Sequence, residues 1–345
     1  IREASVYDIT VKGGKYLEAM AEADTIVFDK TGTLTKAQPT VVDVVSFNGK
    51  TPDELLRIAA CLEEHFPHPV ARAVVRKAEQ EGLHHQEEHT EVEYVVAHGI
   101  ASRLHGKRVL FGSRHYIHHD EGVPVDAMRE DIERLAREGR SILYLAVDGK
   151  LAGLIAIEDP LRPEAAPVIR KLLGRGIRVV MLTGDDERTA AAVAERLGIS
   201  EYRSQVLPTD KAEVIRSLQA EGHTVAMLGD GINDSPALSA ADVGVTLSDG
   251  ADLAREVADV VLTECRLDGL VTAVDLSKAA MRRIRTDFGL IMTLNTVFLA
   301  SGLAGFLQPG PSALLHNLTT VGVSLNAMRP MLKAGAEPQL EEVSA

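Results

Sequence analysis

The stretch that decides the fold is DTIVFDKTGTLT, residues 24–35. Its first half is a short run of β-branched and aromatic residues that ends at Asp29. This pattern predicts a strand buried on both faces with an acid at its carboxyl end. The pattern returns further along the chain at 178–185 (RVVMLTGD), 223–230 (HTVAMLGD), 242–247 and 259–263. Four or five buried strands are therefore expected.

Helical stretches alternate with these strands. Residues 162–173, 186–197 and 209–221 each run up to a glycine, which is a common helix stop. Strands that alternate with helices predict an α/β fold with a doubly wound parallel sheet. The carboxyl ends of such strands meet at one edge, where ligands bind, so Asp29, Thr183 and Asp230 should lie close together.

A long segment, 47–158, interrupts the alternation. It offers helices near 53–64 and 70–81 and short strands near 91–96, 107–111, 142–147 and 151–157. Local pairing among these elements predicts a separate α+β domain inserted into a loop of the first. The run DPLRPEA from Asp159 marks the return to the first domain and is expected to act as a hinge.

Residues 288–307 carry no charge. At about 1.5 Å per residue they are long enough to cross a hydrocarbon core of about 30 Å. A second uncharged stretch, 313–328, follows the turn signal QPGPS. Cations precede the first stretch and follow the second (Arg282, Arg283, Arg285, Arg329 and Lys333), as expected of a membrane hairpin whose ends lie in the cytoplasm. The alternative is two buried helices of a soluble protein.

Composition limits the classes of function. With 345 residues the chain exceeds one ordinary core, so two or three structural units are expected. A net charge of -13 argues against nucleic acid as a partner. The two cysteines, Cys61 and Cys265, indicate buried thiols in a reducing compartment rather than a disulfide framework. The chain opens at Ile1 without a signal peptide, which suggests a C-terminal fragment.

Asp29 is suited to phosphoryl transfer. An aspartate with a pKa near about 4 is already ionised at neutral pH, so it can attack a γ-phosphate without a general base. The obstacle is charge repulsion, which a magnesium ion, a lysine and hydroxyl or backbone donors can offset. The sequence around Asp29, Thr183 and Lys211 supplies such groups.

The string DKTGTLT (29–35) resembles the phosphorylation motif of P-type ATPases, and GDGINDSPAL (229–238) resembles their hinge motif. With TGD at 183–185 and Lys211, these match the four motifs of the haloacid-dehalogenase-like superfamily in the expected order. The resemblance covers essentially the whole chain and is closest to the heavy-metal class of pumps. It implies ATP-driven transport of a transition-metal cation through an aspartyl phosphate, with ATP and magnesium required.

The resemblance also implies the roles of individual residues. Asp29 would be the nucleophile, and Lys211 would balance the charge of the phosphoryl group. Thr183 and Gly184 would contact the phosphoryl group, and Asp185 would be a further catalytic residue. The expected magnesium side comprises Asp29, the Thr31 carbonyl, Asp230, Asn233 and Asp234. Taken alone, Asp234 could equally cap a helix and Lys211 could be a solvated helix charge.

Position 31 separates two classes of enzyme. Soluble phosphatases of the superfamily usually place a second Asp there, which acts as acid and base to hydrolyse the intermediate. Thr31 has no such chemistry, so the aspartyl phosphate should persist. Thr31 and the uncharged run 288–307 both argue against a soluble phosphatase, which is the first alternative. A non-catalytic nucleotide-binding fragment is the second.

The inserted domain is expected to bind ATP. The segment HPVARAVV from His68 resembles the Ser-Glu-His-Pro motif of the heavy-metal class, with Phe66 and Pro67 in place of Ser and Glu. The family's Gly-x-Gly appears as Ala-His-Gly at 97–99. The nucleotide-binding residues carried over are His68, Gly99 and Gly112.

The transported ion would be held by polar residues at membrane depth, where unpaired polarity is costly. The candidates are Asn295, His316, Asn317 and Thr320. His316 and Thr320 partly match the pattern of cobalt-type pumps, with Asn317 in place of Glu, which favours a divalent first-row ion over copper. The actuator domain and membrane helices 1 to 6 of such a pump would lie outside this chain, and the membrane would be that of a bacterial cell.

The predicted division of the chain runs as follows: 1–22 stalk helix from a preceding membrane segment, 23–46 phosphorylation domain, 47–158 nucleotide-binding domain, 159–275 phosphorylation domain again, 276–335 two transmembrane helices, and 336–345 tail.

Overall fold

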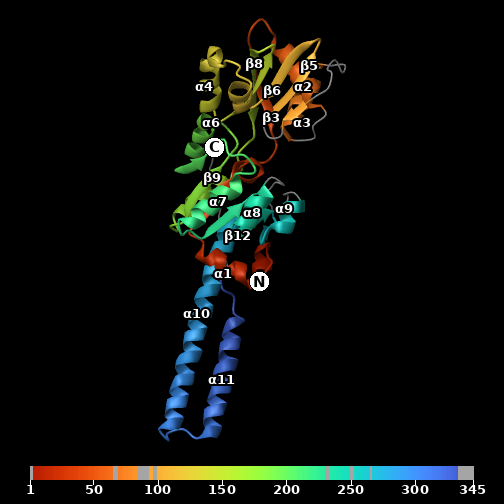
Figure 1. Ribbon diagram of the computed structural model, residues 1–345. Helices are drawn as coiled ribbons and strands as arrows, with labels where there is room; N and C mark the ends of the chain where they lie inside the picture. Colours follow the sequence, from red (N-terminus) through yellow and green to blue (C-terminus); the bar gives the residue numbers. More distant parts are fainter. Residues whose placement is uncertain are drawn as a thin grey trace.

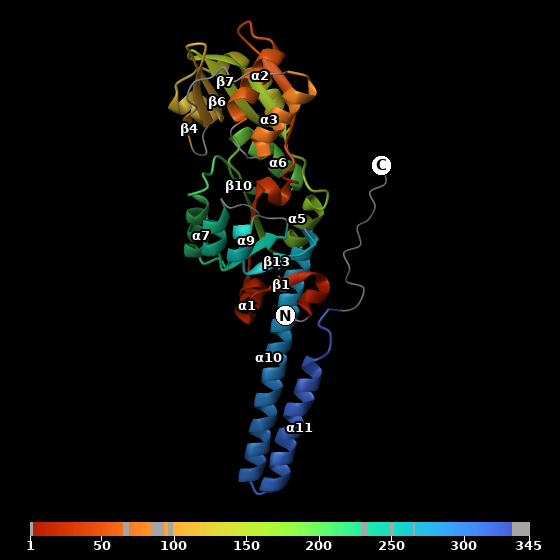
Figure 2. The ribbon, with the colours of Figure 1, turned by 90° about the vertical axis from the view of Figure 1, so that its right-hand side faces the viewer.

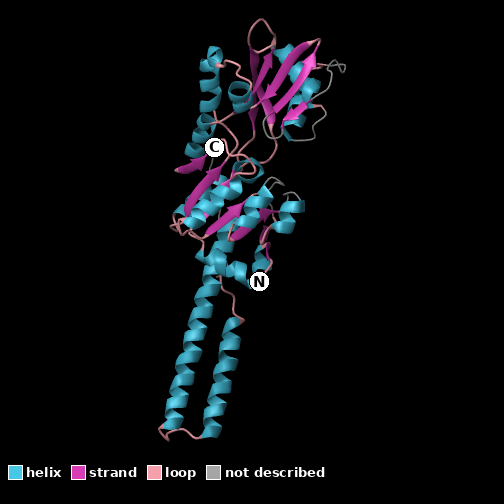
Figure 3. Ribbon diagram, viewed as in Figure 1, coloured by secondary structure: helices cyan, strands magenta, loops and turns pink. Residues whose placement is uncertain are grey.

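Three parts follow one another along the long axis of the molecule (Figure 1; Figure 2). The computed structural model describes residues 3–64, 69–83, 93–95, 99–229, 234–248, 252–264 and 266–332. The inserted domain lies at one end, a second sheet domain lies in the middle, and a pair of long helices forms the other end. The predicted α/β class is confirmed, and Figure 3 shows the two sheets as separate bodies.

The middle domain contains a seven-stranded sheet in the order β1-β13-β12-β11-β2-β9-β10. All pairs are parallel except β1 with β13. The strands are β1 Ile9–Val11, β2 Thr25–Asp29, β9 Arg178–Leu182, β10 Glu201–Arg203, β11 Val225–Leu228, β12 Val243–Leu247 and β13 Val260–Leu262. Every residue of β2 is buried, as its continuous apolar run predicts.

Helices cover both faces of this sheet. On one face Ile26 and Phe28 pack with α5 and α6, and on the other Val27 packs with α7 and α8. The helices are α1 Gly14–Glu22, α5 Ala165–Leu173, α6 Glu187–Leu197, α7 Lys211–Ala220, α8 Ser235–Ala240 and α9 Asp252–Val257. Because successive side chains of a strand point to opposite faces, one strand contributes to two cores. The doubly wound arrangement is confirmed.

The prediction of a single stalk helix over 1–22 is wrong for much of that segment. Ala4–Tyr7 forms a short 3-10 helix, and β1 joins the sheet edge antiparallel to β13. The β-branched residues of Ile9–Val11 alternate between buried and exposed, which suits an edge strand. Only α1, which starts after an extended Gly13, is an α-helix.

The inserted domain is an antiparallel sheet of six strands in the order β3-β8-β7-β6-β5-β4. Its strands are β3 Thr40–Ser46, β4 Glu93–Val95, β5 Gly99–Leu104, β6 Lys107–Gly112, β7 Ser141–Val147 and β8 Lys150–Glu158. Helices α2 Pro52–Glu63 and α3 Pro69–Gln80 pack on one face, and α4 Arg129–Arg137, with the short helices His115–Asp120 and Asp126–Met128, packs on the other. The predicted α+β character is confirmed.

The boundary at residue 47 needs correction. β3 pairs with β8 along almost its whole length, so Thr40–Ser46 belongs to the inserted domain and not to the first part of the phosphorylation domain. A strand beside a domain boundary has the same alternating sequence pattern whichever sheet it joins. Only its pairing in the structure shows to which domain it belongs. The insertion therefore starts at Thr40 and ends at Glu158.

The two long helices, α10 Asp268–Leu303 and α11 Pro309–Ala327, lie side by side. α10 begins inside the middle domain, where Leu270 and Val274 are buried, and continues past the predicted boundary at 275 without a break. Its apolar part is exposed, and no residue of α11 is buried. In the described part of the chain, α10 alone is long and apolar enough to cross a membrane. The alternative of two buried helices is wrong for this chain.

Candidate phosphorylation site

Asp29 lies at the carboxyl end of β2, an inner strand of the sheet between β11 and β9. β2 pairs with β9 up to Asp29 and Leu182, and with β11 up to Phe28 and Leu228. The carboxyl ends of these three strands therefore meet at Asp29, as the sheet topology predicts. Behind Asp29 the chain turns through Gly32, whose φ of 76° is in the left-handed region that favours glycine.

Lys211 joins two carboxylates at this point. Its Nζ lies 2.6 Å from Asp29 Oδ1 and 2.6 Å from Asp234 Oδ1. Asp29, Lys211 and Asp234 are 5%, 7% and 2% exposed, so all three are withdrawn from water. Lys211 is neither solvated nor exposed, and Asp234 makes no side-chain cap to α8. The two local alternatives for these residues are therefore excluded.

Burial and charge set the protonation of this cluster. Burial raises the pKa of Asp29 to about 6; the Lys211 ammonium opposes that rise, and the Asp234 carboxylate adds to it. Burial alone would lower the pKa of Lys211, but the two carboxylates raise it above its ordinary value. Lys211 is thus a cation held between two acids. With both acids ionised, the cluster has a net negative charge that a further cation would offset.

The cluster fits a magnesium ion. Magnesium prefers oxygen ligands and usually binds one or two carboxylates together with phosphate oxygens. Asp29 and Asp234 provide two carboxylates that converge on Lys211. Gly229 leaves space for the Asp234 side chain, because a Cβ at Gly229 would lie 2.8 Å from it. The predicted ligand Asp230 and the predicted Asn233 lie outside the described residues. Thr31 is exposed in the turn that follows Asp29.

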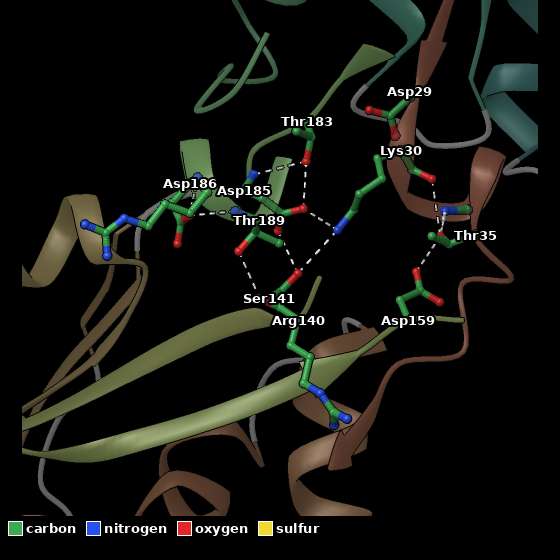
Figure 4. Close-up of polar contacts among 12 residues, drawn as sticks. Asp29, Lys30, Thr35, Arg140, Ser141, Asp159, Thr183, Asp185, Asp186 and Thr189 are labelled. Carbon is green, nitrogen blue, oxygen red and sulfur yellow. Dashed lines mark hydrogen bonds and ion pairs between the residues drawn. The ribbon is translucent and has the colours of Figure 1, made fainter. Parts of the chain in front are cut away.

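Thr183 and Asp185 form a compact loop after β9. The Thr183 hydroxyl donates to Asp185 Oδ2 at 2.9 Å and accepts the Asp185 backbone N–H at 3.1 Å. The Lys30 ammonium forms an ion pair with Asp185 Oδ2, and Ser141 Oγ donates to Asp185 Oδ1 at 2.6 Å (Figure 4). Burial favours the neutral acid, but Lys30, Ser141 and Thr183 together hold the pKa of Asp185 below its usual range. The Asp185 carboxylate therefore stays ionised and holds the Lys30 ammonium and the Thr183 hydroxyl.

The chain crosses between the two sheet domains twice, near Thr35 and near Asp159. Both crossings form hydrogen bonds with the turn that follows Asp29. Thr35 Oγ1 donates to Asp159 Oδ2, and the Gln38 N–H donates to Asp159 Oδ1. Arg162 donates to the carbonyl oxygens of Thr35 and Gly32, each at 3.1 Å. The segment DPLR thus holds the turn that follows Asp29. The hinge role of Asp159 stays a prediction.

The predicted nucleotide residues are partly described. Gly99 and Gly112 are direct partners on β5 and β6. A Cβ at Gly99 would lie 2.5 Å from the Phe111 carbonyl oxygen and 2.5 Å from the Tyr116 ring, so packing in the sheet already requires glycine there. His68 lies outside the described residues, as do Phe66, Pro67 and Ala97.

The membrane-depth candidates lie on both long helices. Asn295 on α10 has a buried side-chain oxygen without a hydrogen-bond partner among the described residues. His316, Asn317 and Thr320 on α11 are exposed, and the Thr320 hydroxyl donates to the His316 carbonyl one turn earlier. Within the described ranges no group of three or more His, Cys, Asp or Glu side chains could hold a metal.

Sequence reasoning missed Lys30 and Ser141. Lys30 stands inside the recognised motif, and that position was its signal. Ser141 is 44 residues from Asp185 and opens a strand of the other domain, so it had no local signal.

Comparisons with known proteins agree with this geometry. Residues 23–242 match the sequence profile of the haloacid dehalogenase-like hydrolases. The chain is 42% identical over 324 residues to a zinc-exporting P-type ATPase of Mycobacterium marinum, and 41% identical over 324 residues to a manganese-exporting P-type ATPase of Mycobacterium tuberculosis. These alignments cover 93% of this chain but 44% and 45% of the two relatives, so the chain spans less than half of their length.

Solved structures of metal-transporting ATPases also resemble this chain. A crystal structure of a zinc-transporting PIB-type ATPase in the E2.Pi state matches with a TM-score of 0.68 and 35% identity, over 96% of this chain and 53% of that one. A structure described by conformational changes in the catalytic domain of the CPx-ATPase CopB-B upon nucleotide binding matches with a TM-score of 0.62 and 27% identity. It covers 78% of this chain and 96% of that chain.

Proposed function

The chain belongs to the haloacid dehalogenase-like hydrolase family and its relatives are metal-exporting P-type ATPases, and on that premise we propose that it is the catalytic portion of a pump that phosphorylates Asp29. One observation carries the proposal. The Lys211 ammonium lies 2.6 Å from each of two buried carboxylates, that of Asp29 at the end of β2 and that of Asp234 at the start of α8. This is the charge arrangement that an acid needs in order to accept a phosphoryl group.

The proposed reaction is a direct displacement at the γ-phosphorus of ATP. An oxygen of the ionised Asp29 carboxylate forms the new bond to phosphorus, the bond to the bridging oxygen breaks, and ADP leaves with that electron pair. Lys211 offsets the repulsion between Asp29 and the phosphoryl oxygens. Magnesium on Asp29 and Asp234, with Asp230 and the Thr31 carbonyl as further proposed ligands, would supply additional positive charge. Thr183 and Gly184 are proposed to contact the phosphoryl group.

The aspartyl phosphate is expected to persist. Thr31 occupies the position where a hydrolytic acid and base would be needed, and a hydroxyl cannot act as one near neutral pH. Release of phosphate would then depend on a group from another domain. We propose that the actuator domain and the earlier membrane helices belong to the part of the pump outside this chain.

The inserted domain is the proposed ATP-binding unit, with His68, Gly99 and Gly112 at its site. Support comes from the related catalytic domain that changes conformation on nucleotide binding. The phosphorylation domain is proposed to comprise 3–39, which includes β1, and 159–275.

The hairpin of α10 and α11 is the proposed membrane anchor, in a bacterial cell membrane with the two sheet domains in the cytoplasm. The exposed apolar surface of α10 supports it. The cargo is proposed to be a divalent first-row ion, with Asn295, His316, Asn317 and Thr320 as candidate ligands. The relatives are named for zinc, manganese and copper, so the metal is proposed only as a class.

The test is acid-stable labelling of the chain by γ-³²P-ATP with magnesium. The wild type should form a label that hydroxylamine removes, because that reagent attacks acylphosphates, and Asp29→Asn should form none. Asp24→Asn is the matched control: it changes an exposed acid at the other end of β2 and should label like the wild type. Equal labelling of Asp29→Asn would refute the assignment. Rapid phosphate release from small esters without a label would favour the soluble phosphatase.

ATP binding without any label would favour the non-catalytic alternative. That comparison is best made on the chain joined to the actuator domain and membrane helices proposed above.

A further inference from the structure

Lys30, the residue after the phosphoacceptor, is directed toward the neighbouring loop. Its side chain is buried and forms an ion pair with Asp185 Oδ2 (Figure 4). Its Nζ also lies 3.3 Å from Ser141 Oγ. Lys30 is thus held by Asp185 and by Ser141, and Ser141 belongs to the inserted domain.

Ser141 opens β7, so its backbone moves with the inserted domain. Its hydroxyl donates to Asp185 Oδ1 at 2.6 Å, and the preceding carbonyl, that of Arg140, accepts the Thr189 hydroxyl at 3.0 Å. A third contact, at 3.5 Å, joins Arg188 on α6 to Glu133 on α4. That last pair is exposed and contributes little. Arg140 and Ser141 therefore both make part-buried docking contacts between the domains, and of the two it is the Ser141 side chain that binds Asp185.

The two oxygens of Asp185 have separate tasks. Oδ1 accepts Ser141, whereas Oδ2 accepts both Lys30 and Thr183. Without the donor on Oδ1, the carboxylate could rotate and exchange its oxygens, and Lys30 and Thr183 would lose a fixed acceptor. Thr183 has a single hydroxyl proton, which in this arrangement points at Asp185. The orientation of Asp185 thus decides where that proton is directed beside Asp29.

The interface has room to move. A cavity of about 200 Å³ borders Lys30 and Ser141 and extends to Thr35 and Asp159 on the two crossings. A shift of the inserted domain can therefore change the Ser141 contact without disrupting a packed core.

We propose that Ser141 is a positioning residue of the inserted domain, which orients Asp185 and thereby holds Lys30 and Thr183 in place beside Asp29. This inference rests on the proposed function, because it concerns the rate of Asp29 phosphorylation. The position of the inserted domain then affects the phosphorylation site through the Ser141 hydroxyl.

The first test compares Ser141→Ala with Ser141→Thr in the full chain. Loss of one hydrogen bond to a charged group should lower the rate of acylphosphate formation at saturating ATP by about tenfold or more. The apparent KM for ATP should change less than about twofold, since nucleotide contacts are untouched. Ser141→Thr keeps the hydroxyl and should restore most of the rate. Ser46→Ala, the same truncation on β3 of the same sheet, should behave like the wild type.

An unchanged rate in Ser141→Ala, or a raised KM at an unchanged rate, would overturn the inference. A faster rate would also overturn it, because the contact would then be a restraint rather than a support.

A second measurement does not depend on catalysis. Spin labels at two exposed positions, Lys107 on β6 and Glu213 on α7, report the distance between the domains in the detergent-solubilised chain with Cys61 and Cys265 replaced by Ser. The wild type, Ser141→Thr and Ser46→Ala should give one narrow distribution, and Ser141→Ala a broader one. If the wild type forms no acylphosphate but the distribution still broadens, the proposed function fails and the docking contact stands. If labelling is normal and Ser141→Ala changes neither rate nor distance, only the Ser141 inference fails.

Discussion

The Asp29, Lys211 and Asp234 cluster places one buried cation between two buried acids. Removing ions from water is costly, and a buried pair offsets that cost only in part. The second acid leaves the cluster short of positive charge. Such an arrangement favours chemistry over stability, as is common at sites that must bind a charged substrate.

Asp29→Asn is therefore expected to stabilise the middle domain in the absence of magnesium. The pKa of Asp29 is raised from 3.8 to about 6, mainly by burial. The stability that the protonated acid contributes is present below pH 3.8 and is lost as pH rises through about 6. Asn avoids this loss. Its advantage should be small near pH 4 and reach about 1–3 kcal/mol above pH 7, measured as the melting temperature of both proteins across this range.

Magnesium provides the control for this prediction. It should raise the melting temperature of the wild type more than that of Asp29→Asn, because the variant lacks one carboxylate ligand. Asp24→Asn, a change at an exposed acid just before β2, should show neither effect. A variant no more stable than the wild type at pH 8 without magnesium would contradict the assignment of burial as the cause.

At the level of elements, the segment after α11 is fastened to the start of the chain. Glu3 accepts the backbone N–H of Met331 at 2.7 Å and that of Leu332 at 3.0 Å. Arg283 on α10 donates to the Pro330 carbonyl oxygen at 3.1 Å. Met331 and Leu332 pack against the core of the middle domain. The second helix of the hairpin is thereby connected to the sheet edge that carries β1.

Glu3→Ala should release this segment. Hydrogen bonds to a charged group contribute about 1.5–3 kcal/mol, so amide exchange at Met331 and Leu332 should speed up by about tenfold or more. Glu22→Ala is the matched control, because its ion pair with Arg285 is exposed and should contribute little. The measurement is hydrogen exchange of the intact chain followed by mass spectrometry. Equal exchange in the two variants would show that packing alone holds the segment.

On the scale of the whole molecule, α10 is a single rod that connects the middle domain to the apolar hairpin. Its first turns are buried against the sheet domain, and its later turns expose large apolar side chains such as Phe288, Leu290 and Leu299. Figure 2 shows the helix running continuously from one region into the other. A rotation of the middle domain would therefore move the hairpin, since no flexible linker separates them.

The intact chain should resist extraction from membranes by alkaline carbonate. Arginine at the centre of a membrane helix costs about 2.5–3.5 kcal/mol per residue, so Leu290→Arg with Leu299→Arg should release a large fraction of the protein. Val6→Arg is the control, because Val6 is also an exposed apolar residue but lies outside the hairpin. Release of the wild type into the supernatant would argue against the membrane anchor.

Much of the fold and of the site could be predicted. The buried strands, the helices between them and the place of Asp29 at a strand tip all follow from local patterns. The predictions failed for β1 and β3, because the partner of each strand lies more than 100 residues away. Lys211 was identified through its motif, but its contact with both acids, across 182 residues to Asp29, needed the fold.

The sequence by itself determined the chemistry available to this protein: a carboxylate at the end of a buried strand, a lysine, a hydroxyl loop and an apolar hairpin. These properties depend on side-chain type and on the local period of apolar residues, which a linear string contains in full. Only the tertiary structure decided which of these groups share a buried space and therefore which charges they present to one another. Ser141 is the clearest case, because its role arises from the docking of two domains and not from any feature of its neighbours in the chain.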